Sequence, residues 1–367
     1  GKRRRERPRV LAPVPGFGPL EAMDVVALTR ALVGIPSITN HEGAVCRWVA
    51  DRLAADGWHV ERQAIAPEGD EVPELPRENL LATPSPSTRP SVVLTTHLDT
   101  VPPHIELGED ETYLYGRGTC DAKGIFAAQW GAAEQLRAEG HEGIALLGVV
   151  GEETDSLGAK QVHELLPQAD FIVDGEPTEL VMASAAKGIL SLGLSWKGVP
   201  GHSAYPEVGH SAVHDLVAAL GRLLAAELPH ETRYGPTTVN VGTLSGGVAP
   251  NVIAPHAHAT VLIRLGAPKD RVLPEVERLL GPQVELEVRS WSEPHGILVP
   301  DGRPSEVVRF GSDVPYLRRI APCLLVGPGS IHDAHTRHEK VKKADLLAAR
   351  DLYAEVARGL LSAAKSE

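Results

Sequence analysis

The order of hydrophobic and polar residues predicts that helices and strands alternate through the first half of the chain. Apolar residues recur at helical spacing from residue 21 until the sequence Gly34-Ile35-Pro36 ends the pattern. Further helices are predicted over 40–56, 125–138 and 158–166, and strands over 58–63, 79–82, 91–96, 144–150 and 171–173. Such alternation is typical of an α/β fold with a mostly parallel sheet and helices on both faces.

The pattern changes after about residue 180. Strands are predicted over 189–196, 237–244, 256–265 and 284–288, and amphipathic helices over 210–228 and 270–280. This β-α-β-β-α-β order is that of a ferredoxin-like α+β unit, so we predict an inserted domain of about 110 residues. A short strand at 323–326 and a helix over 343–364 then return the chain to the first domain.

These patterns divide the chain into four segments. They are a flexible basic arm (1–20), the first part of a main domain (21–182), the inserted domain (183–292) and the second part of the main domain (293–367). The arm contains six Lys or Arg residues and then Pro and Gly, with no apolar stretch that would suit a secretory signal. It is either an extension upstream of Met23, which we favour, or a tether to an anionic surface or a transit peptide.

Composition narrows the possible partners. Of the 367 residues, 43% are hydrophobic and 23% charged, which is typical of a soluble globular protein, and no stretch suits a membrane span. The net charge of −12 argues against a nucleic-acid partner. Cys46, Cys120 and Cys323 are few, odd in number and far apart, which favours a reducing, cytoplasmic compartment over a disulfide framework.

Four segments of the sequence contain charged residues directly after a predicted strand or at the start of a predicted helix. Open α/β sheets build their sites at such positions. In the first segment, His97 and Asp99 are two residues apart, so on an extended backbone they point the same way and the carboxylate can orient the imidazole. The other three segments are glycine-rich 116–124, which contains Asp121, then 149–156 with Glu152 and Glu153, and 173–178 with Glu176.

Each segment by itself has an ordinary structural interpretation. A His-x-Asp pair is more often a hydrogen-bonded pair than a metal site, and adjacent glutamates usually lie on a solvated surface. Segment 116–124 lacks the spacing of a phosphate-binding loop, so it could be only a turn. All four segments, however, fall at predicted strand ends within about 80 residues, and this conjunction favours one shared site.

The motifs resemble those of a known family. They are T-H-L-D-T-V-P, Y-G-R-G-T-C-D-A-K-G, G-E-E-T-D-S-L-G-A, D-G-E-P-T and G-P-G-S-I-H-D-A-H-T-R-H-E. Together they resemble the dizinc aminoacylase and metallopeptidase family, which includes acetylornithine deacetylase, succinyl-diaminopimelate desuccinylase and the glutamate-releasing carboxypeptidase. The resemblance extends from about residue 22 to residue 367.

The resemblance implies that five residues bind two Zn²⁺ ions, for which Co²⁺ or Mn²⁺ could substitute. His97 and Glu176 would bind one ion, Asp121 would bridge both, and Glu153 and His335 would bind the second. Such nitrogen and oxygen ligands suit zinc.

Two histidines near His335 are alternatives as the second ion's ligand. Spacing alone does not exclude His332 or His338. We favour His335 because the Ala-His pair occupies the family position.

Further roles follow from the same resemblance. Asp99 would orient His97, and Glu152 would act as the general base, because adjacent side chains diverge and Glu153 is already a ligand. In the inserted domain, His202 in the sequence G-V-P-G-H-S-A would stabilise the oxyanion, often across a dimer. Asn251 and Arg264 would bind the substrate carboxylate, although an edge-strand ion pair is an ordinary alternative for Arg264.

We therefore expect a cytoplasmic, homodimeric two-zinc amidohydrolase whose inserted domain is both lid and dimer contact. Its substrate would be a small N-acyl amino acid, and the G-R-G-T-C-D element favours an acetylornithine deacetylase-like enzyme of arginine synthesis. A succinyl-diaminopimelate desuccinylase and a dipeptidase or carboxypeptidase are the near alternatives, and a metal-poor binding relative is the alternative outside catalysis. Ala122 and segment 311–316 depart from the family pattern, which loosens the transfer of substrate identity.

Overall fold

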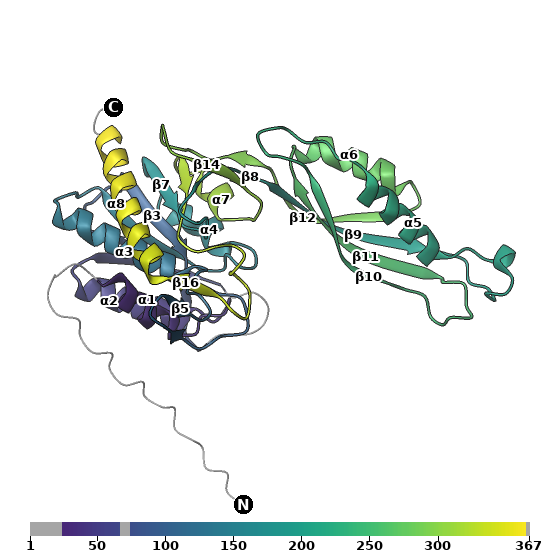
Figure 1. Cartoon of the computed structure of the whole chain (residues 1–367), viewed down its shortest axis with the longest axis horizontal. Coiled ribbons are helices and arrows are strands. Elements are labelled where there is room, and N and C mark those ends of the chain that lie inside the picture. Colours follow the sequence, from purple (N-terminus) through teal and green to yellow (C-terminus); the bar gives the residue numbers. More distant parts are fainter. Residues whose placement is uncertain (1–23, 67–73, 365–367) are drawn as a thin grey trace, which may run out of the picture.

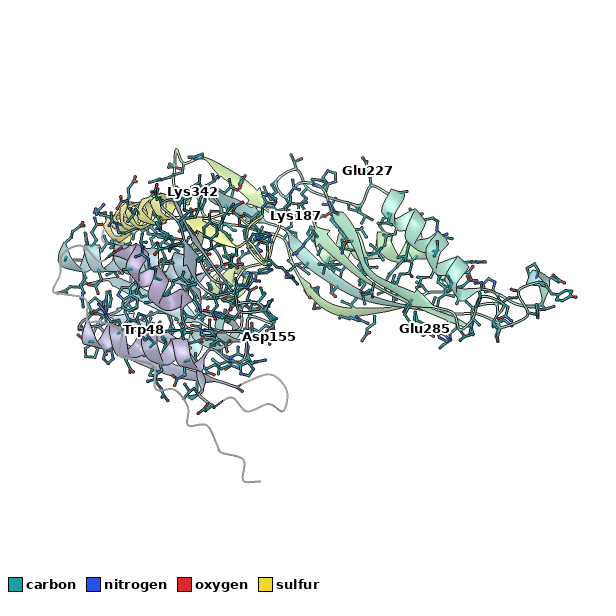
Figure 2. All side chains as sticks on the ribbon, turned by 60° about the horizontal axis from the view of Figure 1, so that its bottom comes forward. Trp48, Asp155, Lys187, Glu227, Glu285 and Lys342 are labelled. Carbon is teal, nitrogen blue, oxygen red and sulfur yellow. The ribbon has the colours of Figure 1, made fainter. Side chains whose placement is uncertain are left out.

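The computed structural model describes residues 24–66 and 74–364, and it consists of two lobes joined by a narrow neck (Figure 1). We call residues 24–187 and 293–364 the main lobe, and residues 188–292 the inserted lobe. Lys187 lies at the neck, where its ammonium group donates a hydrogen bond to the carbonyl of Pro236 (Figure 2). The predicted arm over 1–20 lies outside the described residues.

A six-stranded sheet forms the centre of the main lobe, in the order β1-β2-β6-β3-β7-β15. Neighbouring strands from β6 to β15 run parallel, whereas β2 pairs antiparallel with both β1 and β6. The strands are β1 (His59–Ile65), β2 (Arg77–Thr83), β3 (Val92–His97), β6 (Ile144–Val149), β7 (Phe171–Asp174) and β15 (Cys323–Leu325). The prediction of a mostly parallel sheet is thus confirmed.

Helices cover both faces of this sheet because apolar residues alternate along its strands. Val92 and Leu94 of β3 pack in one core, and Val93 between them packs in a separate core on the opposite face. The first core is covered by α1 (Val25–Val33), α2 (Gly43–Ala55), α3 (Lys123–Ala138) and α8 (Lys343–Ala364). The second core contains residues of the 3₁₀ helix η1 (Val162–Glu164) and of α7 (Val314–Leu317), and the short helix α4 (Leu157–Gln161) comes directly before η1.

Local chemistry sets the helix ends. The Asp24 carboxylate accepts hydrogen bonds from the backbone N–H groups of Val26 and Ala27, both at 3.0 Å, so α1 begins at Val25. The single helix predicted over 158–166 is instead two short pieces, α4 and η1, since the chain tightens from α-helical to 3₁₀ geometry at Val162.

Two small sheets in the main lobe were not predicted. One contains β13 (His295–Gly296), β8 (Met182–Ala186) and β14 (Ser305–Val308), and the other contains β16 (Lys340–Lys342), β5 (Tyr113–Tyr115) and β4 (Gly108–Glu109). These strands are too short to show a repeating hydrophobic pattern. Ala183 and Ala186 of β8 pack in the main-lobe core with Val93, so by packing the inserted lobe begins after β8, at Gly188. The domain boundaries at 182/183 and 292/293 stay predictions.

The inserted lobe is a four-stranded antiparallel sheet with two helices on one face. Its strands lie in the order β10-β11-β9-β12, and the chain order β9-α5-β10-β11-α6-β12 confirms the ferredoxin-like prediction. The elements are β9 (Gly188–Lys197), the 3₁₀ helix η2 (Pro206–Val208), α5 (Ala212–Ala225), β10 (Thr238–Gly246), β11 (His256–Leu265), α6 (Lys269–Leu280) and β12 (Glu285–Ser292). None of the helices in the described ranges combines the length and apolar character that a bilayer crossing requires.

Candidate metal centre

Three neighbouring parallel strands place acidic and imidazole groups at one edge of the main sheet. His97 is the last residue of β3, Glu152 and Glu153 follow β6, and Glu176 follows β7. Because β3 pairs in parallel with both β6 and β7, the carboxyl ends of all three strands meet at this edge.

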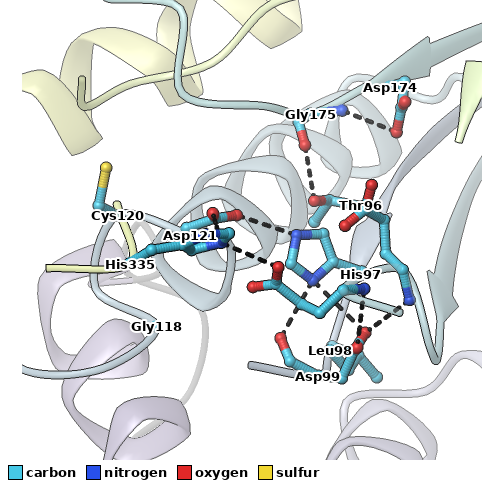
Figure 3. A network of polar contacts seen from close by, with 12 residues as sticks. Thr96, His97, Leu98, Asp99, Gly118, Cys120, Asp121, Asp174, Gly175 and His335 are labelled. Carbon is cyan, nitrogen blue, oxygen red and sulfur yellow. Dashed lines mark hydrogen bonds and ion pairs between the residues drawn. The ribbon is translucent and has the colours of Figure 1, made fainter. Parts of the chain in front are cut away.

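The two predicted zinc histidines approach opposite oxygens of one aspartate (Figure 3). His97 Nε2 lies 3.0 Å from Asp121 Oδ1, and His335 Nε2 lies 3.2 Å from Asp121 Oδ2. The same nitrogen of His335 is 2.9 Å from Glu153 Oε2. A carboxylate between two imidazoles can bridge two cations, so this geometry suits a dinuclear site.

The three glutamates complete the cluster. Among the described residues, two sets of three side chains offer ligand atoms that lie within 4.8 Å of one another, namely His97 with Asp121 and Glu153, and His97 with Glu152 and Glu176. The structure therefore brings together all five predicted ligands and the predicted base. Their division into ligands and base stays a prediction.

The chemistry of this cluster fits a divalent cation. Glu153 Oε1 is buried and has no hydrogen-bond partner among the described residues. Burial raises the pKa of the Glu176 carboxyl well above its usual range, and the nearby Glu152 carboxylate raises it further. Crowded, buried carboxylates are costly unless a cation neutralises them, and zinc prefers nitrogen and oxygen donors such as those gathered here.

Electrostatics in the metal-free protein agree with this assignment. Hydrogen bonds to Asp121 and Glu153 raise the pKa of His335 to about 10. Burial raises the pKa of Glu152 well above its usual range, although His97 opposes the effect. A proton on His335 thus occupies the place that a cation would take between two carboxylates.

Asp99 organises the turn that carries the glutamates. Its Oδ1 accepts hydrogen bonds from the N–H groups of Gly151 at 3.0 Å and Glu152 at 3.1 Å, and its Oδ2 accepts one from the N–H of Glu153 at 3.2 Å. His97 Nδ1 is closer to the backbone oxygen of Asp99, at 3.0 Å, than to its carboxylate, at 3.5 Å. Asp99 thus holds His97 chiefly through its carbonyl, and its carboxylate positions the backbone of Glu152 and Glu153.

The structure distinguishes His335 from the neighbouring histidines. His335 has a positive φ of 62°, an uncommon backbone conformation for a residue other than glycine, and it lies against Asp121 and Glu153. All three histidines are exposed, but within the described residues no hydrogen bond or ion pair joins the rings of His332 and His338 to the cluster. The geometry therefore favours His335 among the three.

The inserted-lobe candidates do not reach the cluster within one chain. His202 lies in the loop after β9, which starts at the neck and is ten residues long, so it spans about 33 Å. Its contacts are local: His202 Nδ1 accepts a hydrogen bond from the N–H of Ala204 at 3.1 Å, and its ring stacks edge-on against Tyr205.

Asn251 and Arg264 lie at opposite ends of the inserted sheet. The Asn251 carbonyl accepts a hydrogen bond from the N–H of Ser203 at 3.1 Å, so Asn251 lies beside His202 at the distal end. Arg264 pairs with Ile189 at the neck end, and its Nη1 is buried with no hydrogen-bond partner in the part of the chain that the structure describes. Within one chain, the two residues therefore cannot bind the same substrate carboxylate.

Sequence reasoning missed two buried acids near the cluster. Asp313, 2% exposed, lies in the segment that departs from the family pattern, and burial raises its pKa to about 6. Glu339, 1% exposed, binds the loop that carries Asp121. The sequence feature that could have pointed to Glu339 is its position four residues after His335, at the end of the motif G-P-G-S-I-H-D-A-H-T-R-H-E.

Comparison with known proteins identifies the family. Residues 93–359 match the model of peptidase family M20/M25/M40, so the chain belongs to this family of peptidases. A probable carboxypeptidase of Aspergillus terreus is 38% identical over 354 residues, which cover 86% of this chain and 82% of that protein. A peptidase M20 domain-containing protein of Schizosaccharomyces pombe is 34% identical over 331 residues, with 88% of this chain and 81% of that protein covered.

Solved structures share the fold. A tripeptidase from Staphylococcus aureus matches with a TM-score of 0.73 and 23% identity over 93% of this chain and 100% of that chain. A dinuclear metal-binding peptidase from Bacillus subtilis matches with a TM-score of 0.64 and 15% identity over 92% of this chain and 98% of that chain. The chain is therefore a metallopeptidase-family hydrolase of the two-lobed α/β type.

Proposed function

We propose that this protein is a two-zinc hydrolase that cleaves the amide bond between an acyl or peptidyl group and an amino acid with a free carboxylate. One observation carries the proposal: His97 and His335 approach opposite oxygens of the buried Asp121 carboxylate, with Glu153 and Glu176 beside them. The Bacillus subtilis neighbour with this fold is described as a dinuclear metal-binding peptidase, which supports two ions here.

The protein's own groups have distinct tasks in this reaction. His97 and Glu176 would hold one zinc ion, Glu153 and His335 the other, and Asp121 both. When bound, the ions would polarise the scissile carbonyl and lower the pKa of a water molecule. Glu152 accepts a proton from the attacking water and then donates it to the leaving amine, so the products are a carboxylic acid and an amine.

The relatives favour a peptide as the first substrate class to test. Those from Aspergillus terreus and several other fungi are named probable carboxypeptidases. The acetylornithine assignment depends on the G-R-G-T-C-D element alone. Both substrates contain an amide next to an amino acid carboxylate, and the proposed metal centre would act on this shared amide.

The positions of the three candidate residues in the inserted lobe support a homodimer as part of the proposal. His202 and Asn251 lie at the distal end of the inserted lobe, whereas Arg264 lies near the neck. A second copy could bring its distal end to this chain's cluster, so that its His202 meets the developing oxyanion there. The distal loops also expose Tyr205 and Val248, at 59% and 63%, which suits a protein contact.

An amine-release assay tests the proposal. The protein, loaded with zinc, is incubated with a panel of dipeptides, N-acetylornithine, N-succinyl-diaminopimelate and N-acetylcitrulline, each at equal concentration. Release of free amino acids from dipeptides supports the dipeptidase or carboxypeptidase class, and preference for N-acetylornithine supports the deacetylase. No release from any of them, with two zinc ions bound per chain, would contradict the proposed reaction.

Metal analysis separates this proposal from a metal-poor binding relative. The proposal expects about two zinc ions per chain after loading, one held by His97 and Glu176 and the other by Glu153 and His335, with Asp121 shared by both. No bound zinc after loading would favour the binding relative.

The three cysteines in the described part of the chain are buried and unpaired, which supports a reducing cytoplasmic location as a further proposal.

A further inference from the structure

The carboxylate of Glu339 lies against the loop that carries Asp121. Its Oε1 accepts hydrogen bonds from three backbone N–H groups, those of Gly118 at 2.8 Å, Cys120 at 3.2 Å and Asp121 at 3.2 Å. The Glu339 side chain is completely buried. Three amides directed at one charged oxygen hold the backbone of this loop in a single conformation.

The second oxygen of Glu339 is paired with a buried arginine. Arg117 Nη1 lies 2.5 Å from Glu339 Oε2, and the Arg117 side chain is 2% exposed. Arg117 Nε also donates a hydrogen bond to the carbonyl of Pro103 at 3.3 Å. A buried charge is costly unless it is paired and hydrogen-bonded, and among the described residues the hydrogen-bond partners of this carboxylate all belong to segment 117–121.

The backbone around Glu339 joins the same two parts of the chain. The Glu339 carbonyl accepts a hydrogen bond from the N–H of Gly116 at 3.0 Å, and β16, which follows directly, pairs with β5 through Lys340 and Tyr115. Glu339 is also four residues after His335. The main chain of Glu339 is therefore continuous with the His335 segment, and its side chain is hydrogen-bonded to the Asp121 segment.

We infer that Glu339 is a positioning residue that holds Asp121 and His335 at metal-binding distance from each other before a metal ion arrives. This inference rests on the proposed metal centre. Glu339 itself touches neither ligand side chain: it acts through the backbone N–H of Asp121 and through the chain that leads to His335. Residues that orient metal ligands in this way typically contribute 10–100-fold to metal affinity or activity, roughly as much as some ligands.

The Glu339→Gln variant tests this role with little change in shape. The amide oxygen can still accept hydrogen bonds from the loop, but the side chain loses its charge, and the amide nitrogen cannot accept the bond from Arg117. We expect zinc affinity, measured by competition with a chromophoric chelator, to fall by about 10–100-fold. At saturating zinc we expect a lower kcat with an unchanged KM, and Glu339→Asp, which keeps the charge, should recover part of the affinity.

Glu134 offers a matched control in the same lobe. It is 6% exposed, accepts a hydrogen bond from Trp58 Nε1 at 2.6 Å, and pairs with Arg137 at 2.7 Å, away from the cluster. Glu134→Gln should lower the melting temperature of the metal-free protein without changing zinc affinity. Equal losses of zinc affinity in Glu134→Gln and Glu339→Gln would overturn the inference, as would wild-type affinity and kcat in a folded Glu339→Gln protein.

Hydrogen exchange of the wild-type protein adds a test that needs neither a variant nor activity. The N–H groups of Gly118, Cys120 and Asp121 should exchange slowly in the metal-free protein, because Glu339 binds them without a metal. Rapid exchange that becomes slow only after zinc is added would overturn the inference. Because zinc affinity and exchange are independent of turnover, a failure of the proposed reaction would leave these results interpretable.

Discussion

His335 Nε2 lies 2.9 Å from Glu153 Oε2, although the two residues belong to different segments of the main lobe, one before and one after the inserted lobe. Glu153 follows strand β6, and His335 belongs to the loop before β16. The contact exists because the lobe is built from two segments that flank the inserted lobe. Hydrolysis by the proposed centre thus depends on the return of the chain after residue 292.

Replacing Glu152 by Gln should abolish turnover and leave metal content unchanged. The side chain would keep its size but could no longer accept a proton, and general-base catalysis is worth about 10²–10⁴-fold in rate. Zinc per chain and kcat are measured on the same preparation. Glu153→Gln is the adjacent control and should lose zinc, whereas zinc loss in Glu152→Gln would make Glu152 a ligand.

Replacing His335 by Ala should weaken zinc binding, and replacing His338 by Ala should not. His335 lies against two buried carboxylates, whereas within the described residues no hydrogen bond or ion pair joins the His338 ring to the cluster. Zinc affinity of both variants is measured by chelator competition. The opposite result, with affinity lost in His338→Ala, would assign the ligand to His338.

Zinc affinity should rise with pH in a way that depends on His335. Its pKa of about 10 in the metal-free protein means that zinc must displace a proton from it at neutral pH. Between pH 7 and 9, affinity should therefore increase more steeply in the wild type than in His335→Ala, by about tenfold per pH unit, the dependence of one released proton. Identical slopes would show that His335 is not protonated in the metal-free site.

The raised pKa of His335 also predicts how the stability of the metal-free protein depends on pH. The pKa is raised from 6.5 to about 10, so the protonated His335 stabilises the metal-free fold. This contribution is complete below about pH 6.5 and is lost as the pH rises through about 10. Chemical denaturation of metal-free wild type and His335→Ala should therefore differ most at low pH within this window and converge at its upper end.

Replacing Gly124 by Ala should destabilise the main lobe. A Cβ at this position would lie 2.2 Å from the Thr119 carbonyl oxygen, a backbone atom in the loop before Asp121, and such overpacking typically costs about 1–3 kcal/mol. Gly359→Ala is the control in the same lobe, because a Cβ there meets nothing within 4 Å and helix α8 should gain about 0.5–1 kcal/mol. Thermal unfolding of the metal-free proteins should give opposite shifts, and a lower melting temperature in both would contradict the steric argument.

The proposed dimer predicts that two impaired variants restore activity when mixed. His202→Ala should have a depressed rate with its metals retained, and Glu152→Gln should be inactive for a different reason. In a mixed dimer, the Glu152 of one chain can act together with the partner's His202. Activity above the sum of the separate variants, measured after exchange of subunits, is expected. No gain on mixing, in a sample shown to exchange, would contradict a site shared between chains.

Hydrophobic periodicity determined most of the fold. In the long strands and helices, apolar residues recur at regular spacing over enough residues to show whether the spacing is that of a strand or of a helix. The main sheet and the β-α-β-β-α-β unit were therefore predictable. The chemistry-bearing residues at strand ends were predictable too, because parallel strands that pair must bring their carboxyl ends to one edge. Even so, the choice among His332, His335 and His338 depended on the resemblance.

The tertiary structure alone decided how distant segments meet. Strands β5 and β16 have three residues each, too few for a period, yet their pairing brings the segments of Asp121 and His335 together. The burial of Glu339 among backbone amides likewise leaves no trace in local sequence, since an acid looks the same whether solvent or peptide N–H groups surround it. Local propensity acts over a few neighbouring residues, whereas these contacts depend on where the whole chain returns.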